Sequence, residues 1–391
     1  MRFDRIRDHR PVRTGFSILD SRIRFGNYFH LMREIVHLHN GWIARVPALD
    51  VKTLLGIHVY EDATFVRRIR QHLRDLEVTG TFPSAPGDGL KVVLEALNSY
   101  KTWEEYVAAI YSVIKPGLMD AWESHFTAGD PLLNEPSQRL IARFMQITAQ
   151  HISGGIGLLE SLHQLGHDVS SRVQEAGSHM RTLWSRIGND FGNSPLAVGE
   201  KYQPVAKPRL QTPRREDFIT VEAQSKPQTF MLGLRECMLE PEEAAFNERA
   251  RVVLHAQLAE QIVWAEIYAV TSHENPQASW EFHEALSRLV WDKIRHAQAI
   301  DKFLGSLGGG WGAQPVDVSH FSAAAALGTK ERLAYIAKKH DMDADRAAVM
   351  RDRLKDRNQH YLANILDHLT AEADSHRRVC LKLTDHLTPA K

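Results

Sequence analysis

The residues best suited to chemistry lie in the C-terminal part of this sequence, where polar side chains interrupt apolar helix faces. Lys293 and His296 fall within a series of apolar residues that recur at intervals of three and four. That spacing places both side chains on one inward-facing stripe of a helix. His376 interrupts a second apolar stripe in the same way. An inward-facing imidazole binds a metal ion or moves a proton, whereas a single core histidine is more often only hydrogen-bonded.

Two acidic residues precede these histidines in a strongly apolar segment. Glu260 and Glu266 lie within Val252–Val270, which is apolar on nearly all sides. A helix of this kind is expected at the centre of a bundle. A buried carboxylate is costly unless it is paired, hydrogen-bonded or bound to a metal ion. At least one of the two acids therefore needs an internal partner, and an arginine, a tryptophan or a metal ion are the alternatives.

An internal repeat connects these positions with the N-terminal part of the chain. The segment Val59–Leu76 aligns without gaps on Val290–Leu307, and two later helical segments align in the same way. The paired positions are Asp62 with Lys293, Phe65 with His296, Thr148 with Ala373, and His151 with His376. Such a match predicts that one helical unit was duplicated. Asp62 and His151 are then the N-terminal residues that could still bind a metal ion.

The segment Val290–Ala297, VWDKIRHA, resembles the W-D-E-x-R-H-A signature of ferritin-like proteins of the di-iron carboxylate superfamily. The segment Glu372–His376, EADSH, lies where that family has D-E-x-x-H. The resemblance covers about residues 246–387, and in the N-terminal half it depends mainly on the repeat. It implies a four-helix bundle in which two helices each supply Glu-x-x-His and the other two a Glu.

The sequence departs from the family pattern at the residues that would bridge two metal ions. Lys293 stands at the first bridging Glu and Ala373 at the second, so we do not expect a di-iron centre in either half. An ammonium group in the site would repel a dication. Glu372 precedes Ala373 by one position, and a rotation of about 100° per residue predicts that its carboxylate leaves the site face.

Three functional interpretations follow. The favoured one is a metal-free ferritin-like protein that binds a small molecule or interacts with a second copy or a homologue, with Lys293 paired to Glu260 or Glu266. The alternative is an oxidoreductase with one Fe, Mn or Zn ion on His296, His376 and Glu260, acting on a small organic substrate. A third makes Lys293 a catalytic nucleophile or base with a depressed pKa.

The composition excludes several other classes of protein. The 48 basic and 48 acidic residues give a formal net charge of zero, which argues against a nucleic-acid partner. No run approaches the roughly 18 apolar residues of a membrane span, and the charged N-terminus does not resemble a signal peptide. The two cysteines lie far apart and form no disulfide framework or metal motif. We therefore expect a cytoplasmic protein without a membrane partner.

Helical periodicity dominates the chain and predicts an all-α fold of two tandem ferritin-like bundles. The expected helices are about 22–45, 50–76, 91–114, 134–165, 241–271, 276–307, 322–339 and 344–387. The polar, Pro-containing stretch between the two blocks is predicted to be an irregular linker. The expected domains are an N-terminal bundle at 1–165, the linker at 166–228 and a C-terminal four-helix bundle at 229–391.

Overall fold

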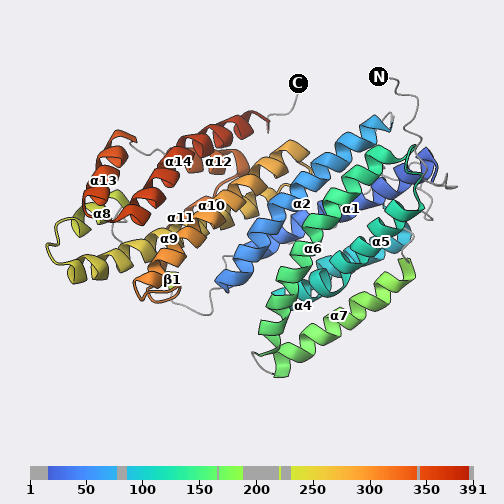
Figure 1. The fold of residues 1–391 in the computed structure, drawn as a ribbon, viewed down its shortest axis with the longest axis horizontal. Coiled ribbons are helices and arrows are strands. Elements are labelled where there is room, and N and C mark those ends of the chain that lie inside the picture. Colours follow the sequence, from blue (N-terminus) through green and yellow to red (C-terminus); the bar gives the residue numbers. More distant parts are fainter. Residues whose placement is uncertain are drawn as a thin grey trace, which may run out of the picture. The chain divides into compact units, whose positions relative to one another are not determined.

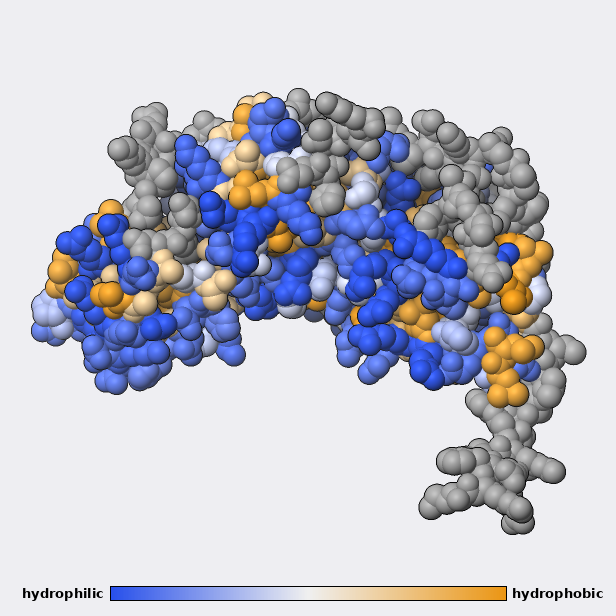
Figure 2. All heavy atoms as spheres, turned by 90° about the horizontal axis from the view of Figure 1, so that it is seen from above, coloured by the Kyte–Doolittle hydropathy of each residue, from blue (hydrophilic) through white to orange (hydrophobic). Residues whose placement is uncertain are grey.

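The computed structural model describes residues 16–76, 86–164, 167–187, 220–221, 230–340 and 344–386. The fold of these residues is all-α, which confirms the predicted class (Figure 1). The described strands are the two-residue β1 (Thr220–Val221) and β2 (Val316–Asp317), which pair in parallel. None of the described helices is both long and apolar enough to cross a bilayer. The face shown in Figure 2 is mostly hydrophilic, with its hydrophobic residues in separate groups.

The chain forms two compact units, and the units do not follow the order of the sequence. Unit 1 contains Met1–Ile35 and Thr64–Ala206, and unit 2 contains Val36–Ala63 and Lys207–Lys391. Helices α1 (Ile18–Ile43) and α2 (Leu49–Asp75) each contribute residues to both units. The division into units therefore differs from the expected limits at 165 and 229. Residues 36–63, from the end of α1 to the middle of α2, belong to unit 2 although they lie in the N-terminal part of the sequence.

Unit 1 is built around the first part of α1, the second part of α2 and the helices that follow. These are α3 (Asp88–Ser99), α4 (Trp103–Ala109), the π-helical turn η1 (Ile110–Ile114), α5 (Lys115–Ala128), α6 (Glu135–His163) and α7 (His167–Ile187). Thr102 and Glu105 form a capping box at the start of α4. Phe144 packs against Phe65 and Trp122 in the core, with ring centroids 4.2 and 5.6 Å away.

The prediction of an irregular linker at 166–228 is wrong over its first part, where the structure has helix α7. Residues 167–187 form this helix, and its buried residues include Met180 and Trp184. The helix is amphipathic although its composition is mostly polar, because a helix that packs on one side needs only one apolar stripe. Residues 188–219 and 222–229 of the expected linker lie outside the described part of the chain.

Unit 2 holds the second sequence block around a central pair of helices. Its elements are α8 (Phe230–Cys237), α9 (Glu243–His273), α10 (Trp280–Ser306), α11 (Ser319–Ala325), α12 (Thr329–Lys339), α13 (Ala344–Asp356) and α14 (His360–His386), with β2. Ser279 is the N-cap of helix α10, and its hydroxyl accepts a hydrogen bond from the Phe282 amide. It lies beside α9 on one side and α14 on the other (Figure 1). This arrangement brings the site residues of α10 and α14 together.

The segment 36–63 is packed tightly into unit 2. The ring of His273 bonds to the carbonyl oxygen of His37 at 2.9 Å. A Cβ atom on Gly56 would lie 2.5 Å from Cγ1 of Ile294, so α2 approaches α10 more closely than a larger residue would permit. Helix α9 is buried over most of its second half, as its apolar sequence predicts.

Candidate functional site

Glu266 has an internal partner that the sequence did not identify. Its side chain is fully buried, and its Oε1 lies 2.7 Å from the Nζ of Lys52, which is equally buried. The Lys52 ammonium also donates to the carbonyl oxygen of Ile43 at 2.6 Å. Glu266 therefore pairs with Lys52, which differs from the expected pairing with Lys293. Glu260 is partly buried and accepts a hydrogen bond from the indole nitrogen of Trp264 at 3.2 Å.

Lys293, His296 and His376 are all buried, with exposed fractions of 6%, 4% and 2%. The apolar periodicity thus gave the correct helix register at these positions. Burial lowers the pKa of Lys293 to about 8, although the negative charges of Glu260, Asp292 and Glu372 oppose this shift. A pKa of about 8 keeps most of the lysine protonated at neutral pH. An ammonium group therefore occupies the position where the ferritin-like pattern has a carboxylate.

Two carboxylates meet the histidines, and the sequence had assigned neither of them to the site. The Nε2 of His376 lies 3.3 Å from Oδ2 of Asp292. The Nε2 of His296 lies 3.0 Å from Oε2 of Glu372. The prediction that Glu372 would point away is wrong, because the flanks of α10 and α14 face each other and a glutamate side chain spans the interval. Both acids stand one residue before Lys293 and Ala373, and this shared offset is the signal that could have identified them.

Arginines hold the remaining oxygens of the same two carboxylates. Oδ1 of Asp292 accepts from Nε of Arg288 and from Nη2 of Arg295, both at 3.1 Å. Oε1 of Glu372 accepts from Nη2 of Arg295 at 2.5 Å. The two guanidinium groups lie over the ring of Trp291, at 4.6 and 4.8 Å from its centroid. Each carboxylate therefore presents one oxygen to an arginine and the other to an imidazole.

The protonation states follow from burial and from these pairs. Burial acts to raise the pKa of Glu372, but hydrogen bonds from His296 and Arg295 outweigh it and lower the pKa to about 2. Burial also acts to raise the pKa of Asp292, and His376 with Arg288 lowers it overall. Burial lowers the pKa of His376 to about 4 and lowers that of His296. At neutral pH the site contains two carboxylate ions and two neutral imidazoles.

Three residues of this arrangement could hold one metal ion. One ligand atom each from Asp292, Glu372 and His376 lies within 4.8 Å of the others. Lys293 and Ala373 stand at the two positions where the ferritin-like pattern has bridging carboxylates, so the residues present do not supply the di-iron ligand set of that pattern. The neighbouring cations also oppose a metal ion, because Arg288 and Arg295 already occupy one oxygen of each carboxylate and Lys293 is buried nearby.

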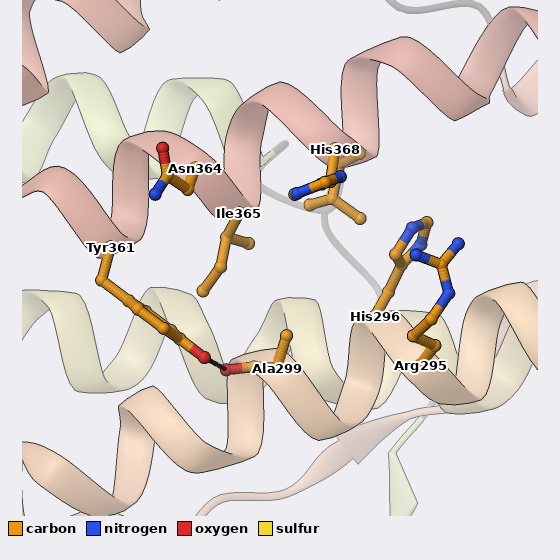
Figure 3. Close-up of a pocket in the computed structure, with 8 residues that line it drawn as sticks. Arg295, His296, Ala299, Tyr361, Asn364, Ile365 and His368 are labelled. Atoms are coloured by element: carbon orange, nitrogen blue, oxygen red, sulfur yellow. Dashed lines mark hydrogen bonds between the residues drawn. The ribbon is translucent and has the colours of Figure 1, made fainter.

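A pocket opens beside the site, between α10 and α14 (Figure 3). Its volume is about 290 Å³, and its lining residues are Arg295, His296, Ala299, Tyr361, Asn364, Ile365, His368 and Leu369. Tyr361, Asn364 and His368 are exposed, while His296 is buried. The Nε2 of His296 lies beside Glu372, whereas its Nδ1 has no hydrogen-bond partner among the described residues. The pocket therefore leads from the surface to the buried ring of His296, whose nitrogen atoms are themselves closed off from solvent.

The two N-terminal residues singled out by the repeat each have a local partner. Asp62 belongs to unit 2, where its Oδ2 lies 3.4 Å from Nε2 of His39. His151 belongs to unit 1, where its Nδ1 lies 2.8 Å from Nζ of Lys115. The paired position Thr148 is also buried in unit 1. In unit 1, a buried lysine thus contacts the histidine that the repeat pairs with His376.

The geometry on α10 and α14 consists of a carboxylate–histidine–arginine network next to a small pocket. Comparisons with protein-family models, with curated proteins and with solved structures give no match for this chain. The resemblance to ferritin-like proteins is therefore carried by the two motifs at Val290–Ala297 and Glu372–His376.

Proposed function

We propose that this chain is a ferritin-like protein of two helical bundles in which ion pairs replace the di-metal site and a small organic molecule binds between α10 and α14. The observation that carries the proposal is the pocket of about 290 Å³ that ends on His296 and Arg295. Ligand pockets are concave, mostly apolar and furnished with a few convergent polar groups. This pocket has that character, with a volume at the small end of the usual range.

The ion pairs support a binding role because they fix the polar wall of the pocket in advance. The guanidinium group of Arg295 is held by Asp292 and Glu372 together. The ring of His296 is held by Glu372. A side chain already fixed in its binding geometry loses little conformational entropy when a ligand arrives. The acids would then position the binding residues and would not themselves need to touch the ligand.

The proposal predicts that filling the pocket abolishes binding without unfolding the chain. Ala299→Phe places a ring in the pocket from α10, and Ala371→Phe on an exposed part of α14 is the matched control. Ligand-observed NMR with a library of small fragments should give binders for the parent protein and for Ala371→Phe. Ala299→Phe should lose them, while its circular dichroism spectrum stays helical. A library in which no fragment binds the parent protein at millimolar concentration would refute the proposal.

A second candidate function is the binding of one divalent metal ion, with oxidoreductase activity on a small molecule. The favouring observation is the close approach of Asp292, Glu372 and His376, three residue types that bind transition metals. Asp292 and Glu372 take the place of Glu260 in this set, since Glu260 bonds to Trp264. The positive charge of the neighbouring side chains disfavours it.

Metal analysis separates the two candidates. Protein purified without chelators should carry well under one metal ion per chain if ion pairs have replaced the metal. Anaerobic titration with Fe(II), Mn(II) or Zn(II) should likewise show no stoichiometric binding. One ion per chain that is lost in both His296→Ala and His376→Ala, but kept in the exposed control His360→Ala, would establish the metal site of the second candidate and refute the replacement of the metal by ion pairs.

A further inference from the structure

We infer that the pocket between α10 and α14 selects a small organic carboxylate with an apolar tail, the head binding at Arg295 and His368 and the tail lying toward Tyr361. This inference depends on the proposed function, since it names the class of ligand for the same pocket. It specifies the charge of the ligand and its orientation in the pocket, and both can be tested separately from binding itself.

The charge of the lining residues indicates an anion. Arg295 contributes a permanent positive charge, His296 and His368 contribute imidazoles, and none of the eight lining residues is acidic. Behind the lining, the positive charges of Arg288 and Lys293 are opposed by the carboxylates Asp292, Glu372 and Glu260. Arg295 is the permanently charged residue of the lining itself, and an anionic ligand is attracted to it. The low dielectric constant around buried groups makes that attraction stronger than it would be in water.

A donor in the pocket wall has no acceptor. Arg295 uses Nη2 for Asp292 and Glu372, whereas its buried Nε has no hydrogen-bond partner among the described residues. Leaving a buried donor unsatisfied costs free energy. Because Nε is closed off from solvent, a ligand oxygen recovers that free energy only when the guanidinium group of Arg295 turns toward the pocket. A carboxylate suits this position, because guanidinium groups bind carboxylate oxygens with favourable geometry and charge.

The apolar part of the pocket lies away from Arg295. Figure 3 shows Arg295 and His296 at one end, Tyr361 at the other and Ile365 between them. The Tyr361 hydroxyl donates to the carbonyl oxygen of Ala299 at 3.4 Å, which fixes the ring. Ile365 and Leu369 are buried and add apolar surface. The volume of about 290 Å³ accommodates about ten non-hydrogen atoms, at roughly 30 Å³ each.

The test compares hexanoate with hexanamide, its neutral equivalent, and with inorganic phosphate, by isothermal titration calorimetry of the full chain. We expect one hexanoate per chain, bound at least about tenfold more tightly than hexanamide or phosphate, a difference that corresponds to about 1.4 kcal/mol. Hexanamide as strong as hexanoate would overturn the assignment of an anionic head. Phosphate as strong as hexanoate would overturn the assignment of an apolar tail.

Variants show whether the binding is at this pocket. Arg295→Gln and His368→Leu should each weaken hexanoate by about tenfold or more and bring it close to hexanamide. His368 is exposed, so its variant tests the head position without disturbing the Asp292–Glu372 network. Arg378→Gln removes one charge from an exposed arginine of the same helix and should bind hexanoate normally. Equal binding by Arg295→Gln, His368→Leu and Arg378→Gln would overturn the inference.

The failure of the carboxylate assignment is distinguishable from the failure of the proposed function. If neutral fragments bind the parent protein and Ala299→Phe abolishes their binding, but hexanoate has no advantage, the pocket is a binding site and only the ligand class is wrong. If neither hexanoate nor any fragment binds, the proposed function is wrong as well.

Discussion

Lys52→Met is expected to destabilise the protein by about 3–5 kcal/mol, because it leaves the carboxylate of Glu266 buried without its cation. Both side chains have an exposed fraction of 0%, and their charged atoms are 2.7 Å apart. The substitution also removes the hydrogen bond to the Ile43 carbonyl oxygen. Urea denaturation, monitored by circular dichroism and by hydrogen exchange in α2 and α9, measures the loss.

Two further variants test the cause of this destabilisation. The double variant Lys52→Met/Glu266→Leu should recover a large part of the lost stability, since a buried pair replaced by apolar groups is often tolerated. Arg139→Ala removes a partner from an exposed ion pair with Glu135, whose side chains are 81% and 43% exposed, and should cost less than about 1 kcal/mol. A double variant as unstable as Lys52→Met would show that the ion pair is not the reason.

A steep loss of stability on acidification is the second large effect that we expect. Burial, with the nearby charge of Arg24, lowers the pKa of His125 to about 3. Burial lowers that of His376 to about 4. In the unfolded chain each has a pKa near 6.5, so below that pH the unfolded state binds protons that the folded state does not. The contribution of these two neutral imidazoles to the free energy of unfolding is therefore fully present above about pH 6.5. As the pH falls toward 4, the free energy of unfolding decreases by up to about 1.4 kcal/mol per pH unit for each of the two groups.

His125→Phe provides the direct check of this expectation. His125 is fully buried among the rings of Phe25 and Tyr28, so phenylalanine retains the apolar packing. The variant should lose less stability than the parent protein between pH 7 and pH 4, by a few kcal/mol, in urea titrations at each pH. The exposed His179→Gln should leave the pH dependence unchanged. Parallel pH profiles for the parent protein and His125→Phe would contradict the assignment.

Most helices were predictable from sequence where strong end signals are present. The helix expected at 134–165 is α6, Glu135–His163, because Asn134 and Pro136 mark its start. The helix expected at 344–387 is instead two, α13 and α14, separated near Asn358, which has a φ of 60°. Neither glycine nor proline marks this break, and an isolated asparagine occurs often enough in helices that it does not identify a helix end.

The candidate site could be predicted in part. Periodicity correctly placed Lys293, His296 and His376 in the interior, since register is a local property of each helix. It could not identify Asp292 and Glu372, because their role depends on how the flanks of α10 and α14 face each other. The choice of Lys52 as the partner of Glu266 likewise depends on packing between segments that are far apart in sequence.

The composition of unit 2 has a consequence for biosynthesis. On the ribosome, residues 36–63 emerge roughly 180 residues before the start of α9, which at about 5–20 residues per second is a delay of about 10 to 35 s. During that interval the nascent chain carries the buried charge of Lys52 and the tight contact surface at Gly56 with nothing to cover them. Unit 2 is therefore completed only after its distal part has been translated.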